Sequence, residues 1–179
     1  FAVLPGMIQS YDEEDQYNLG SWEGNPLNIY SGIICGVDAE DVVIYGQGTI
    51  NGNASKQDWW GRKYREVFRP RLFFINHCKD VTLTGVTVCN SPSWTLHPYF
   101  SENLKFVDLF IKNPADSPNT DGCDPESCKN VDILGVHFSV GDDCIAVKSG
   151  KIYMGKKYKK PSENLMIRQC LMEDGHGAV

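Results

Sequence analysis

The chain has 179 residues, of which 41% are hydrophobic and 22% charged, and this is enough for one globular core. Its net charge of −6 argues against a broad nucleic-acid-binding surface, and no apolar run approaches the ~20 residues that a membrane-spanning helix needs. No targeting signal is visible at the N-terminus, so we expect the chain to be part of a longer protein.

A sequence repeat runs through most of the chain. Each copy starts with Asn or Asp and continues with apolar residues at offsets +1, +3, +6 and +8. An incomplete copy begins at Asp41 and loses its spacing near Gly46-Gln47-Gly48. Four complete copies follow, and they begin at Asp80, Asn103, Asn130 and Asn164.

The spacing within a copy predicts two short strands that meet at a corner. Each pair of apolar residues alternates with a period of two, which is typical of a half-buried strand, and the parity changes between the pairs. Gly85 and Gly135 lie at this change in two copies. We therefore predict an all-β fold, a right-handed parallel β-helix that is incomplete at both ends. It would form one domain over residues 1–179, with its clearest rungs at about 72–179. A β-sandwich is the alternative, but sandwiches do not repeat a sequence in register.

The repeat also predicts which polar side chains stack on neighbouring rungs. Asp142 follows Phe138 by four residues, and His176 follows Met172 by four. Equivalent positions should lie about 4.8 Å apart at the backbone. If residues 113–118 are a loop insertion, Asp121 falls in the same column.

Asp143 is expected beside this column. The apolar parity changes between Gly141 and Cys144, so a corner there lets both Asp142 and Asp143 face solvent. The sequence therefore predicts a ladder of Asp121, Asp142 and His176, with Asp143 next to it.

Three segments now resemble a known family. Asn119-Thr120-Asp121, Gly141-Asp142-Asp143 and Gly175-His176-Gly177 are similar, in order and spacing, to the N-T-D, D-D and G-H-G signatures of glycoside hydrolase family 28, the polygalacturonases. The resemblance extends from about Gly46 to the last residue. The family's fourth signature, R-I-K, binds the substrate carboxylate and is absent from the 179 residues. We therefore expect a fragment.

The resemblance implies hydrolysis of the α-1,4 bonds between galacturonic acid units of pectin, with inversion at the anomeric carbon. By motif, Asp142 would be the general acid, and Asp121 and Asp143 would position the attacking water. His176 would contact Asp142 or the sugar. Asn119, Gly175 and Gly177 would bind substrate, and no metal or cofactor is implied. A rung spacing near 5 Å is closer to retaining than to inverting carboxylate pairs, and here we follow the family.

A basic segment follows the two aspartates. Residues 148–161 contain six Lys and no acidic residue, and such a segment would attract a polyanion. Lys148 has the outward parity of its strand, so we predict that it binds substrate.

Several alternatives remain at this point. A β-eliminating pectate lyase would share the solenoid but would need Ca²⁺ and an Arg or Lys base. An inactive fragment, a non-catalytic pectin-binding solenoid, or a hydrolase of rhamnogalacturonan or xylogalacturonan would also fit. Endo and exo attack are both open, although insertions at 51–70 and 149–161 would favour exo attack by closing one end of a groove.

The expected partner is an acidic polysaccharide such as pectin or oligogalacturonate. We expect a monomer that binds neither nucleic acid nor membrane. The resemblance implies a secreted or periplasmic protein, although no signal is visible in this chain.

Overall fold

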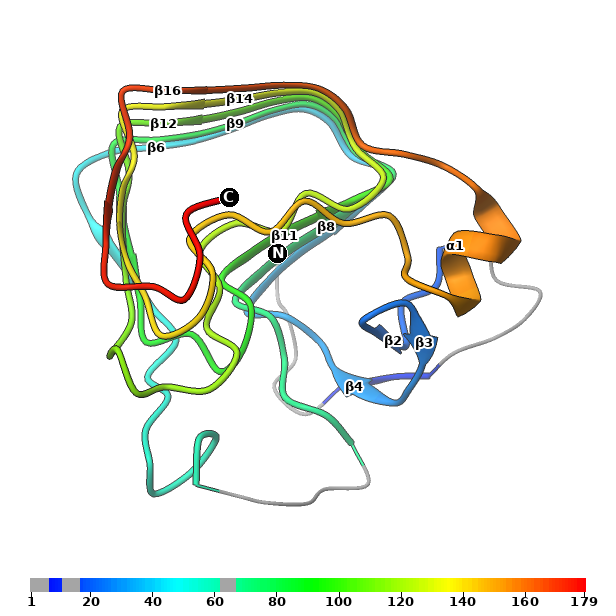
Figure 1. Cartoon of the computed structure of the whole chain (residues 1–179), viewed down its shortest axis with the longest axis horizontal. Coiled ribbons are helices and arrows are strands. Elements are labelled where there is room, and N and C mark those ends of the chain that lie inside the picture. The colour runs from blue at the N-terminus through cyan, green and yellow to red at the C-terminus, as the bar shows by residue number, and fades with distance from the viewer. Residues whose placement is uncertain (1–6, 11–16, 62–66) are drawn as a thin grey trace.

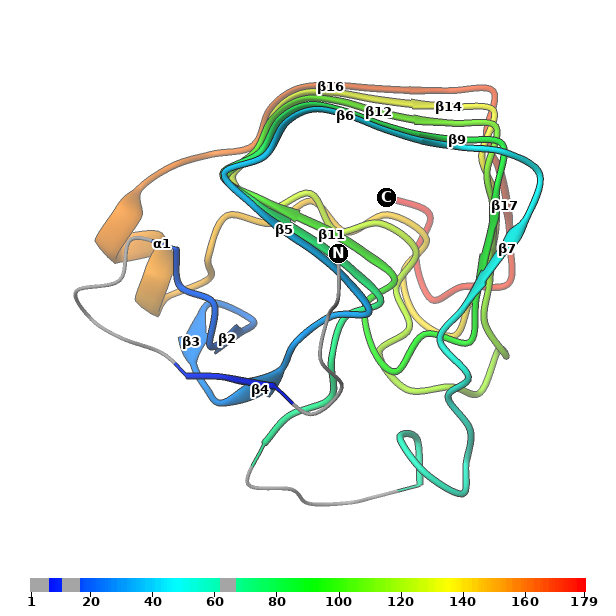
Figure 2. The same cartoon turned by 180° about the vertical axis from the view of Figure 1, so that it is seen from behind.

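Three parallel sheets form the walls of a coil in the computed structural model, which describes residues 7–10, 17–61 and 67–179 (Figures 1 and 2). The first sheet contains β6 (Glu40–Tyr45), β9 (Lys79–Thr84), β12 (Glu102–Val107), β14 (Lys129–Leu134) and β16 (Glu163–Arg168). The second contains β7 (Thr49–Asn51), β10 (Thr87–Cys89), β13 (Phe110–Lys112), β15 (His137–Ser139) and β17 (Leu171–Glu173). The third contains β5 (Ile34–Val37), β8 (Phe73–Asn76) and β11 (Leu96–Tyr99).

The third sheet continues as single bridges on two further rungs. Leu96 pairs with Cys123, which pairs with Ile145, and Tyr99 pairs with Glu126, which pairs with Lys148. This architecture is the right-handed parallel β-helix that the sequence predicts.

The repeated apolar residues fill the interior of the coil, as predicted. Their side chains stack in columns because equivalent strands pair in register: Val81 with Leu104 and Val131, and Val88 with Ile111 and Phe138. All of these residues are buried. The incomplete copy at Asp41 has one extra residue, since Ile50 rather than the residue before it pairs with Val88. The extra residue explains why the spacing fails near Gly46.

The Asn or Asp at the start of each copy turns a corner of the coil. Asp41, Asp80, Asn103, Asn130 and Asn164 all have φ between 53° and 56°, a left-handed conformation that Asn and Asp tolerate better than most residues. Their side chains also form a ladder across the rungs. The amide of Asn130 donates to Asn103 Oδ1 at 2.9 Å, and the amide of Asn164 donates to Asn130 Oδ1 at 3.0 Å.

The described part of the chain before β5, residues 7–10 and 17–33, lies outside the coil and next to the third sheet (Figure 1). It contains β1 (Ile8–Gln9), which pairs with β4 (Ile29–Tyr30), and a hairpin of β2 (Ser21–Trp22) and β3 (Asn25–Pro26). The helix α1 (Tyr153–Tyr158) packs against this hairpin. Met154 N donates to Gly24 O at 3.1 Å, and Lys151 forms an ion pair with Glu23. The basic segment is therefore held against the N-terminal hairpin.

Candidate active site

Three carboxylates converge where successive rungs leave the second sheet. Asp121, Asp142 and Asp143 each contribute an oxygen, and these three oxygens lie within 4.8 Å of one another. Asp121 precedes the bridge residue Cys123, and Asp142 and Asp143 precede Ile145. The residues that the sequence places in one ladder are thus brought together.

The register within the cluster differs from the expected one. Cys123 pairs with Ile145, so the position two residues before Cys123 matches the position two residues before Ile145. Asp121 is therefore equivalent to Asp143 rather than to Asp142. The insertion between β13 and Asp121 is one residue shorter than the six-residue insertion predicted at 113–118. Asp121 is therefore offset by one residue from its predicted place in the column.

His176 lies next to Asp142, as the repeat predicts. Its backbone N–H donates to Asp142 O at 3.0 Å, and its Nδ1 lies 3.3 Å from Asp142 Oδ1. The imidazole is 71% exposed, whereas the Asp142 side chain is 23% exposed. His176 therefore forms the solvent side of the cluster.

The two glycines beside His176 are required by close packing. A Cβ at position 177 would lie 2.8 Å from Asp143 Oδ1, and a Cβ at position 175 would lie 2.8 Å from Cys144 Sγ. Any larger residue would push against the carboxylate or against the strand that holds it. Gly175 and Gly177 thus allow the His176 rung to approach the two aspartates.

Asn119 orients Asp142 from the preceding rung. Its amide nitrogen lies 3.4 Å from Asp142 Oδ2, and its Oδ1 accepts a hydrogen bond of 2.7 Å from Arg69. Arg69 also donates to Pro92 O at 2.9 Å and to Pro118 O at 2.7 Å, which fixes the loop that carries Asn119. Arg69 could not be predicted from the sequence, because it lies 50 positions before Asn119 and outside the repeat.

Asp121 is the most buried of the three carboxylates, with only 4% of its surface exposed. Burial raises its pKa to about 6, and the negative charge of Asp142 acts in the same direction, while Lys148 opposes both. Asp121 therefore titrates close to neutral pH.

Lys148 is the cation of the site. Its Nζ lies 3.0 Å from Asp124 Oδ1 and 3.7 Å from Asp121 Oδ2, and it lies 4.3 Å from the centre of the Trp94 ring. Asp124 and Asp121 raise the pKa of Lys148 against the effect of its burial, so the ammonium stays charged. The prediction that Lys148 faces the site is consistent with this position.

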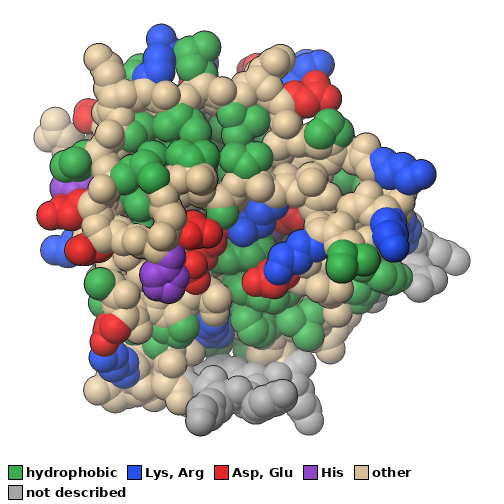
Figure 3. Space-filling view, in the orientation of Figure 1, with side chains coloured by type: hydrophobic (Ala, Val, Ile, Leu, Met, Phe, Trp, Pro, Cys, Tyr) green, Lys and Arg blue, Asp and Glu red, His purple; other side chains and the backbone are tan. Residues whose placement is uncertain are grey.

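Asp124 is a residue that sequence reasoning missed. It is fully buried, and this burial raises its pKa well above the usual value. The negative charge of Asp121 raises the pKa of Asp124 further. Asp124 in turn lowers the pKa of Asp121 and so opposes part of the rise that burial causes there. Its spacing of three residues from Asp121 was the available signal. Figure 3 shows acidic side chains and a histidine gathered on one face, with basic side chains across from them.

Comparisons with known proteins identify the family of this chain. Residues 15–179 match the family described as Glycosyl hydrolases family 28. The chain belongs to this family. A probable polygalacturonase of Vitis vinifera is 38% identical over 154 residues, covering 84% of this chain and 31% of that protein. An endo-polygalacturonase of Pectobacterium carotovorum is 36% identical over 148 residues, covering 75% of this chain and 35% of that protein.

Two solved polygalacturonase structures share the fold. The exopolygalacturonase of Thermotoga maritima has a TM-score of 0.80 at 31% identity, covering 87% of this chain and 44% of that one. The polygalacturonase of Erwinia carotovora has a TM-score of 0.67 at 30% identity, covering 83% and 40%. The chain spans about a third of the length of the curated relatives that it matches. Among the described residues, no helix is long and apolar enough to cross a membrane.

Proposed function

We propose that the protein hydrolyses the α-1,4 bonds of polygalacturonate in pectin, with acid and base catalysis by its carboxyl groups. The observation that carries the proposal is the convergence of Asp121, Asp142 and Asp143 within 4.8 Å, beside His176 and Lys148. The names of the family 28 relatives support the substrate. Hydrolysis of this kind needs only carboxyl groups and water, so the proposal involves no metal or cofactor.

Asp142 is the proposed general acid. It lies between Asn119 on one side and His176 on the other, so both of its oxygens have a polar neighbour. The protonated carboxyl of Asp142 would donate its proton to the leaving glycosidic oxygen.

Asp121 and Asp143 are proposed to hold the attacking water. They occupy equivalent places on neighbouring rungs, so a water between them can donate one hydrogen bond to each carboxylate. The raised pKa of Asp121, about 6, suits a base, since a base works best when its pKa lies near the working pH. The water would then attack the anomeric carbon.

Substrate binding is assigned to Lys148, Asn119, Gly175 and Gly177. Lys148 offers a charged donor to a galacturonate carboxylate and is partly exposed, at 23% of its side chain. Asn119 borders Asp142, and the two glycines leave the space above Asp143 free of side chains.

Inversion at the anomeric carbon is proposed from family membership. The carboxylate oxygens lie within 4.8 Å, which is nearer to the ~5–5.5 Å typical of retaining pairs than to the ~6.5–9.5 Å of inverting pairs. Those typical values are distances between two whole carboxyl groups on either side of a substrate. The value of 4.8 Å is instead the upper limit for the distances between one selected oxygen of each group. The family is therefore the better guide to stereochemistry.

Pectin as the substrate implies three further assignments. The partner would be an acidic polysaccharide, the protein would act outside the cytoplasm, and residues 1–179 would form one β-helix domain with the N-terminal hairpin packed on it.

The test is release of reducing ends from polygalacturonate by the full-length protein and by Asp142→Asn. We expect the substitution to lower kcat by about 10²- to 10⁴-fold, the usual contribution of a general acid. Asp132→Asn is the matched control, because Asp132 lies on β14, on the opposite side of the coil. An Asp142→Asn variant with undiminished activity would contradict the proposal. Unsaturated products, detected by absorbance, would indicate a lyase instead.

A further inference from the structure

The column that contains Asp121 and Asp143 continues toward the N-terminus with an aromatic residue. Leu96 pairs with Cys123, which pairs with Ile145. The residues two positions earlier, Trp94, Asp121 and Asp143, are therefore equivalent on three successive rungs. A linear substrate that lay along the coil axis over the carboxylates would meet Trp94 on the next rung.

Trp94 is covered by the N-terminal hairpin. It is only 1% exposed, and the ring of Trp22 stacks on it with centroids 4.2 Å apart and planes inclined by 26°. The ring of Phe68 also packs on Trp22, with the two ring centroids 4.2 Å apart. The buried guanidinium of Arg71 holds the hairpin backbone by donating to Ser21 O at 2.5 Å. At Trp94, the rung before Asp121 therefore offers no surface to a polymer.

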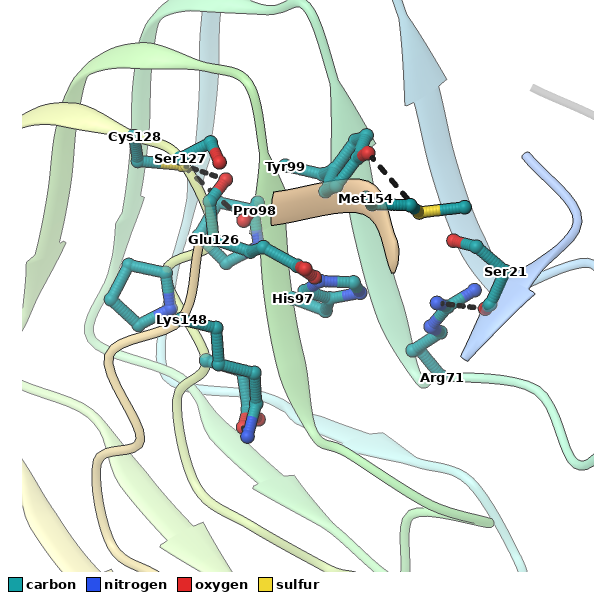
Figure 4. A network of polar contacts seen from close by, with 12 residues as sticks. Ser21, Arg71, His97, Pro98, Tyr99, Glu126, Ser127, Cys128, Lys148 and Met154 are labelled. Atoms are coloured by element: carbon teal, nitrogen blue, oxygen red, sulfur yellow. Dashed lines mark hydrogen bonds and ion pairs between the residues drawn. The ribbon is translucent and has the colours of Figure 1, made fainter. Parts of the chain in front are cut away.

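The covering extends over the outer face of the third sheet. His97, Tyr99 and Glu126 point away from the coil interior, yet each is at most 3% exposed. His97 bonds Glu126 at 2.9 Å, and Tyr99 OH donates to the Met154 sulfur of α1 at 3.9 Å. Figure 4 shows His97, Tyr99 and Glu126 on the same side as Met154 and the hairpin residue Ser21.

The hairpin and α1 form one structure over this face, which we call the hairpin wall and define as residues 18–27, 68–71 and 150–158. Gly24 and Gly150 are in close contact, and Tyr158 OH donates to Asn18 Oδ1 at 2.7 Å. Together with the ion pair of Lys151 and Glu23, these contacts join segments more than 100 residues apart. The wall is therefore part of the packed structure.

We infer that the hairpin wall closes the substrate groove one rung from the carboxylates, so that the enzyme accepts only an end of a polygalacturonate chain and acts as an exo-hydrolase. This inference rests on the proposed function. One rung is about 4.8 Å, which leaves room for about one sugar unit between the carboxylates and Trp94. The ammonium of Lys148 lies over the Trp94 ring, so in this arrangement it would meet the carboxylate of that end unit. The product is monogalacturonate.

The test is a time course of polygalacturonate digestion by the full-length protein, with products separated by anion exchange and viscosity measured in parallel. We expect monogalacturonate as the main early product and little loss of viscosity while the first few per cent of bonds are cleaved. Oligomers of mixed length with a rapid loss of viscosity would overturn the inference and leave the proposed function intact. Absence of any reducing-end release would contradict the proposed function and this inference with it.

A variant of the wall sharpens the test. Trp22→Ala should expose Trp94 and raise the share of dimer and trimer among early products several-fold. Tyr45→Ala is the matched control, since Tyr45 lies on the outside of β6 and is 78% exposed. A folded Trp22→Ala protein with the product pattern of the control would contradict the role of the wall. Where Trp22→Ala does not fold, the time course of the unaltered protein decides the question.

Discussion

The ammonium of Lys148 lies 3.7 Å from the carboxylate of Asp121. Lys148 belongs to the rung of Asp142 and Asp143, so it spans two rungs and counters the negative charge of the cluster. It also approaches the buried carboxyl of Asp124 at 3.0 Å. A single cation thus contacts both Asp121 of the cluster and the fully buried carboxyl group of Asp124.

Lys148→Ala should weaken binding of oligogalacturonate. A hydrogen bond to a charged group contributes about 1.5–3 kcal/mol, so we expect KM to rise by about 10-fold or more in the full-length protein, and to depend less on salt. Lys105→Ala, on the exposed side of β12, removes the same charge away from the site. Steady-state kinetics at two salt concentrations provide the measurement. An unchanged KM for Lys148→Ala would show that Lys148 does not bind substrate.

The titration of Asp121 should be visible in stability. Burial raises its pKa from 3.8 to about 6, so the folded state binds this proton more tightly than the unfolded state does. The resulting stabilisation is fully present below about pH 4 and is lost as pH rises through about 6. The difference in pKa corresponds to about 3 kcal/mol.

Asp121→Asn removes this titration. Between about pH 3.5 and pH 7, the free energy of unfolding of the unaltered protein should therefore fall by about 3 kcal/mol relative to that of the variant. Urea unfolding at several pH values measures the difference, and Asp132→Asn serves as the control. Parallel pH profiles for Asp121→Asn and the unaltered protein would rule out a raised pKa.

The coil and the carboxylate cluster were largely predictable from the sequence. The repeat makes the interior columns recognisable in the sequence. Val81, Leu104 and Val131 recur at the same offset because each of them must face the same core. The same spacing brought Asp142 and His176 together. Asp121 was placed one residue off, because the length of an irregular insertion has no periodic signal.

The parts around the cluster were not predictable in the same way. Arg69 reaches Asn119 through tertiary packing, and Trp22 reaches Trp94 from a segment outside the repeat. Asp124 lies outside the repeat and is fully buried in the structure. These contacts arise when loops fold over the coil, so only the three-dimensional structure shows them.

The asparagine ladder should contribute measurably to stability. Asn130 has φ of 56° and takes part in two amide hydrogen bonds. Asn130→Gly keeps the left-handed backbone and loses the bonds, so it should cost about 1 kcal/mol. Asn130→Ala also adds the strain of a left-handed alanine, so it should cost about 2–3 kcal/mol. Chemical unfolding compares the two, and an Ala variant as stable as the Gly variant would contradict the backbone argument.

Gly177→Ala should impair catalysis more than folding. Its Cβ would lie 2.8 Å from Asp143 Oδ1 and would displace that carboxylate. We expect kcat to fall by about 10- to 100-fold with the melting temperature nearly unchanged. Gly48→Ala is a suitable control because a Cβ there meets no atom within 4 Å. Equal kcat values for the two variants would show that the position of Asp143 does not limit the reaction.

The central claim is that the carboxylates activate water for direct attack on a galacturonosidic bond. Proton NMR of freshly cleaved oligogalacturonate tests it most directly, because the anomeric signal appears before mutarotation mixes the two forms. We predict that the β-anomer of the new reducing end appears first with the full-length protein, and that the signal is almost lost with Asp142→Asn. A first product with the α-configuration, or equal rates for the two proteins, would contradict the account.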